Sequence, residues 1–191
     1  MGSAENMIDH AVEVAASAHR GQFRKGTAIP YISHPYAVAL ILSRAGCPDE
    51  LIVAGILHDI VEDTELTLEY IRENFGQKIA AIVEGCSEPD KSLSWEQRKT
   101  DAVKFLKTAS SELRTVACAD KLHNLRRTIV DYQKIGEAVW ERFNRGKQAQ
   151  ECYYRELVSV FGDPPGCQAA REIFQQFNDA VGILFGPDEC S

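Results

Sequence analysis

A short run at residues 58–63 carries the side chains best suited to chemistry. It places the pair His58-Asp59 just before a second acidic pair, Glu62-Asp63. Imidazole nitrogens and carboxylate oxygens are the usual ligands of divalent Mn, Fe, Zn or Co ions. A metal held here would polarise phosphate and acidify a bound water, and Glu62 or Asp63 could then act as an acid or a base. The alternative interpretation is a set of solvated carboxylates near the end of a helix.

Two other segments offer ligands of the same kind. His34 lies at a loop–helix junction, because Pro35 follows it and proline favours the first turn of a helix. Asp120 follows the apolar run 116–119, where a charge is costly unless it is paired or bound to a metal. Lys121 could pair with Asp120, so a buried ion pair is the alternative to a metal site.

The order His … His-Asp … Asp resembles that of the HD superfamily of metal-dependent phosphohydrolases. Local motifs resemble the hydrolase domain of the Rel/SpoT alarmone enzymes and the stand-alone small alarmone hydrolases, over about residues 8–160. These motifs are Ala18-His19-Arg20-Gly21-Gln22, Arg24-Lys25, Pro30-Tyr31-Ile32-Ser33-His34-Pro35, His58-Asp59-Ile60-Val61-Glu62-Asp63-Thr64 and Ala119-Asp120-Lys121-Leu122-His123-Asn124-Leu125.

This resemblance implies an all-α bundle with one metal ion, usually manganese. It also implies removal of pyrophosphate from the 3′ position of guanosine tetra- or pentaphosphate, which leaves GDP or GTP. The family's metal ligands fall on His34, His58, Asp59 and Asp120, and its catalytic acidic pair falls on Glu62 and Asp63. Its substrate-binding residues fall on Arg24, Lys25 and Asn124, with Ser33 and Lys121 as further candidates for the pocket.

Other functions remain open at this stage. The loop 26–29 differs in spacing from the long Rel/SpoT enzymes, and residues 138–154 match the hydrolase less well. One alternative is an HD phosphohydrolase that acts on another nucleotide or phosphate ester. A second is a nucleotide-binding module without turnover. The residue types suit several first-row metals, and the sequence does not indicate an oligomeric state.

The elements that position these residues are expected to be helices. Apolar residues recur at spacings of three and four, and nothing alternates strand with helix. The pattern predicts a compact all-α bundle forming one domain over 1–191, with a core at about 8–160. A C-terminal helical extension at about 167–185 is expected to pack on that core. The predicted helices are 8–18, 35–44, 49–61, 68–75, 77–86, 95–108 with a basic face, 111–130, 137–161 and 167–184.

Charge and composition limit the classes of molecule that this protein is expected to bind. The net charge of −7 argues against a broad nucleic-acid or membrane surface, although a local basic pocket could still bind a nucleotide polyphosphate. No apolar run approaches the roughly 20 residues of a membrane-spanning helix. No secretory signal is visible, and the six cysteines form no C-x-x-C pair. We therefore expect a cytoplasmic protein with reduced thiols and no nucleic-acid or membrane partner.

Overall fold

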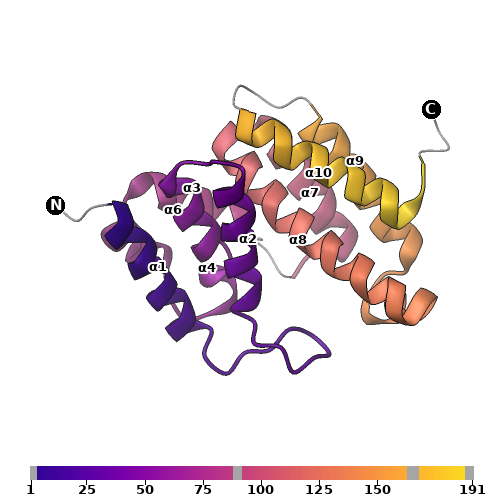
Figure 1. The fold of residues 1–191 in the computed structure, drawn as a ribbon, viewed down its shortest axis with the longest axis horizontal. Helices are drawn as coiled ribbons and strands as arrows, with labels where there is room; N and C mark the ends of the chain where they lie inside the picture. Colours follow the sequence, from indigo (N-terminus) through magenta and orange to yellow (C-terminus); the bar gives the residue numbers. More distant parts are fainter. Residues whose placement is uncertain (1–3, 88–91, 163–167, 188–191) are drawn as a thin grey trace.

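The computed structural model describes residues 4–87, 92–162 and 168–187, and this part of the chain is helical (Figure 1). Its one β-bridge, between Phe23 and Pro30, closes the loop 21–30. The all-α prediction is therefore confirmed. The helices are α1 (Ala4–Ala18), α2 (Ser33–Arg44), α3 (Asp49–Leu57), α4 (Ile60–Asp63), α5 (Leu68–Phe75), α6 (Gln77–Cys86), α7 (Trp95–Thr108), α8 (Ser111–Ile135), the 3-10 helix η1 (Gly136–Arg142), α9 (Lys147–Phe161) and α10 (Gln168–Phe185).

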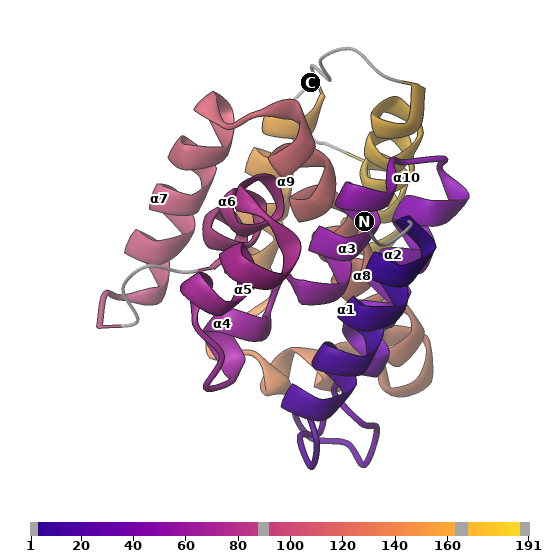
Figure 2. The same cartoon turned by 90° about the vertical axis from the view of Figure 1, so that its left-hand side faces the viewer.

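The long helix α8 joins the two halves of the bundle. Helices α1 to α6 form one half, and α7, α9 and α10 lie on the other side (Figures 1 and 2). Helix α8 packs against α2 and α3 in the first half and against α10 in the second. Its side chains Leu122 and Leu125 are fully buried. The apolar core therefore runs through both halves and fixes α8 relative to α2 and α3.

The last helix packs on the core, as its apolar spacing predicts. Its buried face covers α8 and touches α2. The face consists of Ala169, Ala170, Ile173, Phe174, Phe177, Ala180, Val181 and Leu184. Because Phe177 is completely buried, α10 is an integral part of the bundle.

The predicted helix 49–61 is wrong in one respect, because the structure divides it. Helix α3 ends at Leu57, and the short helix α4 begins at Ile60. In a continuous helix the carbonyl of Gly55 would accept the backbone amide of Asp59. Here the ring nitrogen Nδ1 of His58 lies 2.8 Å from that carbonyl and donates to it. The side chain therefore competes for the helical acceptor at the point where the helix breaks.

The predicted helix 137–161 is also divided. Helix α8 continues to Ile135, beyond the predicted end, and stops at Gly136, whose φ of 59° suits a residue without a side chain. A 3-10 helix follows, and α9 begins only after Gly146, which has extended backbone angles. In the described part of the chain, no helix is both long and apolar enough to cross a membrane.

Candidate metal centre

Two histidines and two aspartates meet where α2, α8 and the α3–α4 junction come together. The Nε2 atom of His34, in the first turn of α2, lies 3.1 Å from Oδ1 of Asp120 and 3.4 Å from Oδ2 of Asp59. The Nε2 atom of His58 lies 3.1 Å from Oδ1 of Asp59 and 3.2 Å from Nε2 of His34. Side chains that are distant in the sequence thus direct their donor atoms to one point.

Close packing of α2 on α3 makes this convergence possible. A Cβ atom added at Gly55 would lie 2.5 Å from Cδ1 of Leu42, a buried side chain of α2. Real Cβ atoms do not approach other atoms so closely. Glycine at this position therefore leaves room for the Leu42 side chain where α2 packs on α3, the two helices that carry His34 and lead into His58.

The donor set suits a divalent cation. A carbonyl oxygen only accepts hydrogen bonds, so Nδ1 of His58 must carry the hydrogen that it donates to Gly55. In the neutral ring, Nε2 of His58 then carries no hydrogen, and its lone pair faces the carboxylate oxygens. Ligand atoms of His34, His58 and Asp120 lie within 4.8 Å of one another, and Asp59 contacts both histidines. Such a cluster of acceptors needs a positive charge at its centre.

The two histidines differ in their pKa shifts: burial lowers the pKa of His34, whereas for His58 the effect of burial is outweighed by the carboxylates beside it. Burial opposes a charge on His58, but the carboxylates of Asp59 and Asp120 raise the pKa of this ring to about 9. Burial also opposes charge on the aspartates. Nevertheless, His58 holds the pKa of Asp59 below its usual range, and Lys121 with the histidines does the same for Asp120. Both carboxyl groups are therefore ionised at neutral pH and available to a metal.

Neighbouring side chains hold the two carboxylates in place. The hydroxyl of Tyr31 donates to Oδ2 of Asp59 at 2.5 Å. Lys121 donates to Oδ2 of Asp120 at 2.7 Å, and Asn124 donates to Oδ1 of Asp120 at 2.7 Å. The Asp120–Lys121 pair considered as an alternative to a metal site thus exists. It uses Oδ2, whereas Oδ1 faces the histidines.

The second ring nitrogen of His34 also has a partner. Its Nδ1 lies 2.6 Å from Nδ1 of His123, and the two rings stack with centroids 4.9 Å apart. Burial, followed by the charges of His34 and Arg24, lowers the pKa of His123 to about 3. His123 is therefore neutral at ordinary pH.

The predicted catalytic pair lies on α4, directly after Asp59. Glu62 is half-buried and Asp63 is exposed. The side chain of Gln22 donates to the backbone carbonyl of Asp63 at 2.7 Å and also contacts His19, which ties α4 to the loop after α1. Because α3 ends at Leu57, this pair lies on the separate short helix α4.

The predicted substrate residues have different surroundings. Arg24 reaches Asn124, with Nη2 3.2 Å from Oδ1, and Asn124 in turn holds Asp120. Lys25 is exposed on the same loop as Arg24. The hydroxyl of Ser33 donates to the carbonyl of Pro30 at 2.8 Å, so it closes the turn before α2.

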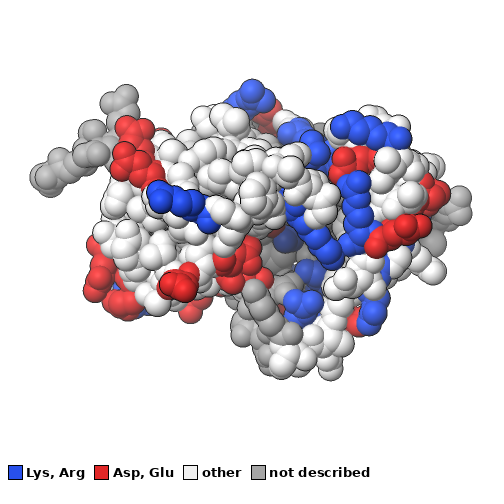
Figure 3. All heavy atoms as spheres, turned by 90° about the horizontal axis from the view of Figure 1, so that it is seen from below, with Lys and Arg blue, Asp and Glu red and all other residues white. Residues whose placement is uncertain are grey.

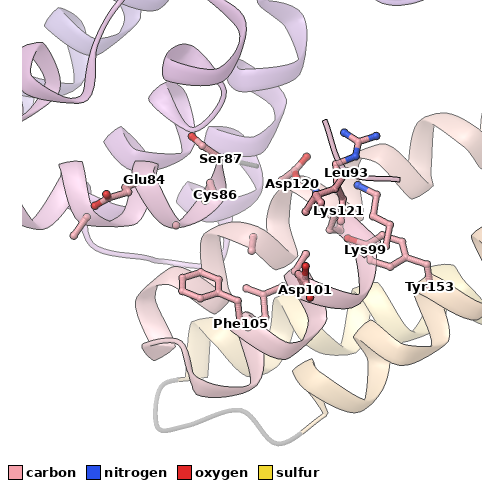
Figure 4. Close-up of a pocket in the computed structure, with 16 residues that line it drawn as sticks. Glu84, Cys86, Ser87, Leu93, Lys99, Asp101, Phe105, Asp120, Lys121 and Tyr153 are labelled. Carbon is pink, nitrogen blue, oxygen red and sulfur yellow. Dashed lines mark hydrogen bonds and ion pairs between the residues drawn. The ribbon is translucent and has the colours of Figure 1, made fainter. Parts of the chain in front are cut away.

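A cavity of about 510 Å³ opens beside Asp120 and Lys121, between α6, α7 and α8 (Figure 4). Three cations line it, namely Arg98, Lys99 and Lys121, and Lys99 lies over the ring of Tyr153 at 5.2 Å. The acidic side chains of Glu84, Asp101 and Asp120 also line it (Figure 4), and the rest of the wall is mainly apolar, with Leu93, Phe105, Leu106, Ala81, Ala102 and Ala117. The face shown in Figure 3 likewise gathers basic side chains around a hollow.

Sequence reasoning named only some of these residues. Among the cations of the cavity it proposed Lys121 alone, although the basic face expected for residues 95–108 was a signal for Lys99. It proposed no role for Tyr31 or His123, although both occur in the motifs. Their contacts with the ligands join distant segments, so local spacing could not reveal them.

This chain is similar in sequence to a known protein family and to several named proteins. The family model described as HD domain matches residues 11–147. A zebrafish (Danio rerio) relative named guanosine-3′,5′-bis(diphosphate) 3′-pyrophosphohydrolase MESH1 is 42% identical over 129 residues, which are 65% of this chain and 70% of that protein. A Streptomyces coelicolor relative named GTP pyrophosphokinase is 39% identical over 122 residues, which are 62% of this chain and 14% of that protein.

Solved structures show a similar fold. A metazoan ortholog of SpoT, described as hydrolysing ppGpp, matches with a TM-score of 0.71 and 26% identity, covering 96% of this chain and 99% of that one. A Listeria monocytogenes protein matches with a TM-score of 0.74 and 36% identity, covering 81% and 99%. This chain spans only about a seventh of the Streptomyces relative, but most of MESH1 and of both solved structures. The chain therefore belongs to the HD-domain family.

Proposed function

We propose that this protein is a metal-dependent phosphohydrolase that removes the 3′-diphosphate from guanosine tetra- or pentaphosphate. The observation that carries the proposal is the convergence of His34, His58, Asp59 and Asp120, with an acidic pair on the next turn. The relatives named as 3′-pyrophosphohydrolases support this choice of substrate. A nucleotide substrate of this kind also favours a cytoplasmic location.

The four converging side chains would hold one divalent ion, and we propose Mn²⁺. When bound, the ion would polarise the scissile phosphate and lower the pKa of a water molecule. Tyr31, Lys121 and Asn124 fix the carboxylates, so these ligands lose little rotamer freedom when they bind the ion.

We assign the proton transfers to Glu62 and Asp63. One carboxylate accepts a proton from the water that attacks the phosphorus next to the 3′ oxygen. The bond between that phosphorus and the 3′ oxygen then breaks, and the 3′ oxygen takes up a proton. GDP and pyrophosphate leave when the substrate is guanosine tetraphosphate.

Cations on both sides of the centre would bind the substrate. Asn124 donates to Oδ1 of Asp120 and contacts Arg24, and Lys25 follows Arg24 on the loop 21–30. Lys121 donates to Oδ2 of Asp120 and lines the cavity together with Lys99. A substrate with phosphates at both the 3′ and the 5′ positions needs such charge on either side of the scissile bond, despite the acidic net charge of the chain. We retain Ser33 as a further candidate.

The test is to incubate the purified protein with Mn²⁺ and guanosine tetraphosphate and to separate the products by anion exchange. We expect GDP and pyrophosphate in equal amounts, and no products after chelation. An Asp59→Asn variant should be inactive, whereas Asp9→Asn, a change on the exposed surface of α1, should be fully active. If guanosine tetraphosphate is not hydrolysed while the metal remains bound, we would conclude that the substrate is another phosphate ester. Tight nucleotide binding without any product would indicate a binding module.

A further inference from the structure

We propose that His123 is a positioning residue for the metal site, and that its Nδ1 accepts a hydrogen bond from the ring of His34. This inference rests on the proposed function only in requiring a metal ion at the centre. It assigns to His123 the task of directing the lone pair of His34 toward that ion.

The short contact between the two rings leaves one arrangement of hydrogens. Their Nδ1 atoms are 2.6 Å apart, so one of them donates and the other accepts. A histidine that binds a metal through Nε2 carries its hydrogen on Nδ1. His34 must therefore be the donor, and His123 must be the acceptor, with its own hydrogen on Nε2.

The two histidine ligands differ in what fixes them. His58 donates to the carbonyl of Gly55, a backbone group that can only accept. His34 depends on a side chain, and a histidine can either donate or accept. Because Nε2 of His34 faces Asp59 and Asp120 at the metal centre, the Nδ1 of His34 is left to donate, and His123 accepts.

The position of His123 on α8 also suits this role. It lies one turn after Asp120 on the same helix, and its ring stacks on His34 at an interplanar angle of 27°. Helix α8 therefore supplies one metal ligand and also the group that orients another on α2. A change at His123 should disturb metal binding without removing any ligand.

The experiment measures Mn²⁺ affinity of the metal-free protein by calorimetry, in the absence of any nucleotide. His123→Leu removes the acceptor and should weaken binding by about 10- to 100-fold, the effect typical of losing such a partner. His123→Asn places an amide oxygen near the position of Nδ1 and should restore most of the affinity. His10→Leu, on α1 and in ring contact with Phe75, is the matched control and should bind as the wild type does.

Unchanged affinity in His123→Leu would overturn the proposal, and so would an equal loss in His123→Asn. If the leucine variant does not fold, as judged by thermal unfolding without metal, His123→Phe keeps the stacked ring and lacks the acceptor. It should show the same loss of affinity. Because no nucleotide is present, the result is independent of whether guanosine tetraphosphate is the substrate.

Discussion

At the scale of single residues, the candidate ligands are held by a surrounding set of hydrogen bonds. Asp120 receives a bond on each oxygen, from Asn124 and from Lys121, and Asp59 receives one from Tyr31. Side chains restrained in this way are organised before the metal binds, which lowers the entropic cost of binding. Substitutions at the partners should therefore weaken metal binding, whereas substitutions at the proposed acid–base pair should not.

The Glu62→Gln variant separates these two roles. We expect kcat for guanosine tetraphosphate to fall by about 10²- to 10⁴-fold, the range for loss of a general acid or base. The Mn²⁺ content, measured by mass spectrometry, should stay at the wild-type level. Glu65→Gln, an exposed change just beyond α4, is the control and should keep full activity. Loss of the metal in the Glu62 variant would contradict this division of roles.

The affinity for Mn²⁺ should rise with pH. Although burial opposes the charge, the carboxylates raise the pKa of His58 to about 9 in the metal-free protein, so below that pH its ring carries a proton. The metal must displace this proton, and the affinity should increase about tenfold per pH unit between about pH 6 and 8. Titrations followed by the electron paramagnetic resonance of unbound Mn²⁺ would measure this slope. A flat profile would show that His58 does not lose a proton on binding.

The sequence motifs predicted the candidate ligands that the structure brings together, but they did not predict the side chains that hydrogen-bond to them. His58 and Asp59 stand in a run whose chemistry is evident from residue type alone. The role of His123 depends on the approach of α8 to α2, two helices that are far apart in the chain. Nothing in the spacing of a single motif encodes such a contact.

At the scale of elements, the break between α3 and α4 shows why apolar periodicity wrongly predicted one continuous helix over 49–61. Leu57 and Ile60 are both fully buried, so the apolar pattern continues across the break. At the interruption, Nδ1 of His58 donates to the carbonyl of Gly55, and apolar periodicity cannot predict such a side-chain hydrogen bond. Helix starts marked by local chemistry were predictable, as at Thr67, whose hydroxyl caps α5 by accepting the amide of Tyr70.

Gly55 leaves room for the buried Leu42 side chain where α2 packs on α3. In Gly55→Ala the new methyl group would clash with Leu42, and we expect a loss of about 1–3 kcal/mol in the free energy of unfolding. Metal affinity should fall as well, because His34 and His58 would be displaced. Gly182→Ala, in α10 with open space around it, should instead gain up to about 1 kcal/mol. Urea denaturation of both variants would test the comparison, and equal stability would contradict it.

The basic face of α7 should matter for substrate binding and not for the metal. Lys99→Met removes a cation from the cavity, and we expect KM for guanosine tetraphosphate to rise by about tenfold, as for a lost charged hydrogen bond. Lys104→Met lies on the same helix with 71% of its side chain exposed, and should leave KM unchanged. Equal kinetics in the two variants would place the substrate outside this cavity.

At the scale of the whole molecule, an ion at this site would connect α2 and the α3–α4 junction to α8, the helix that joins the two halves of the bundle. We therefore expect Mn²⁺ at about 100 times its Kd to stabilise the protein by about 2.7 kcal/mol, which thermal unfolding would detect as a higher Tm. His58→Ala should abolish this increase, because one ligand is lost. An increase that persisted in the variant would place the stabilising ion at another site.

The overall fold was easier to predict from the sequence than the helix ends or the contacts of single residues. Periodic apolar residues sufficed to predict an all-α fold and the packing of the last helix, because helices must bury such faces. The long helix over 111–130 was predicted, but its continuation to Ile135 and the 3-10 helix after it were not. They depend on Gly136 and on the packing of Trp140, whose ring stacks with that of Phe185 in α10.

The distribution of the ligands along the chain has a practical consequence. His34, His58 and Asp59 all precede α7, and Asp120 follows it. A protein cut between α6 and α7 would thus divide the donor set between two polypeptides, neither of which holds all four groups. Tight Mn²⁺ binding would appear only after the fragments reassemble. The centre would then work as a complementation sensor, in which metal uptake reports the association of the two pieces.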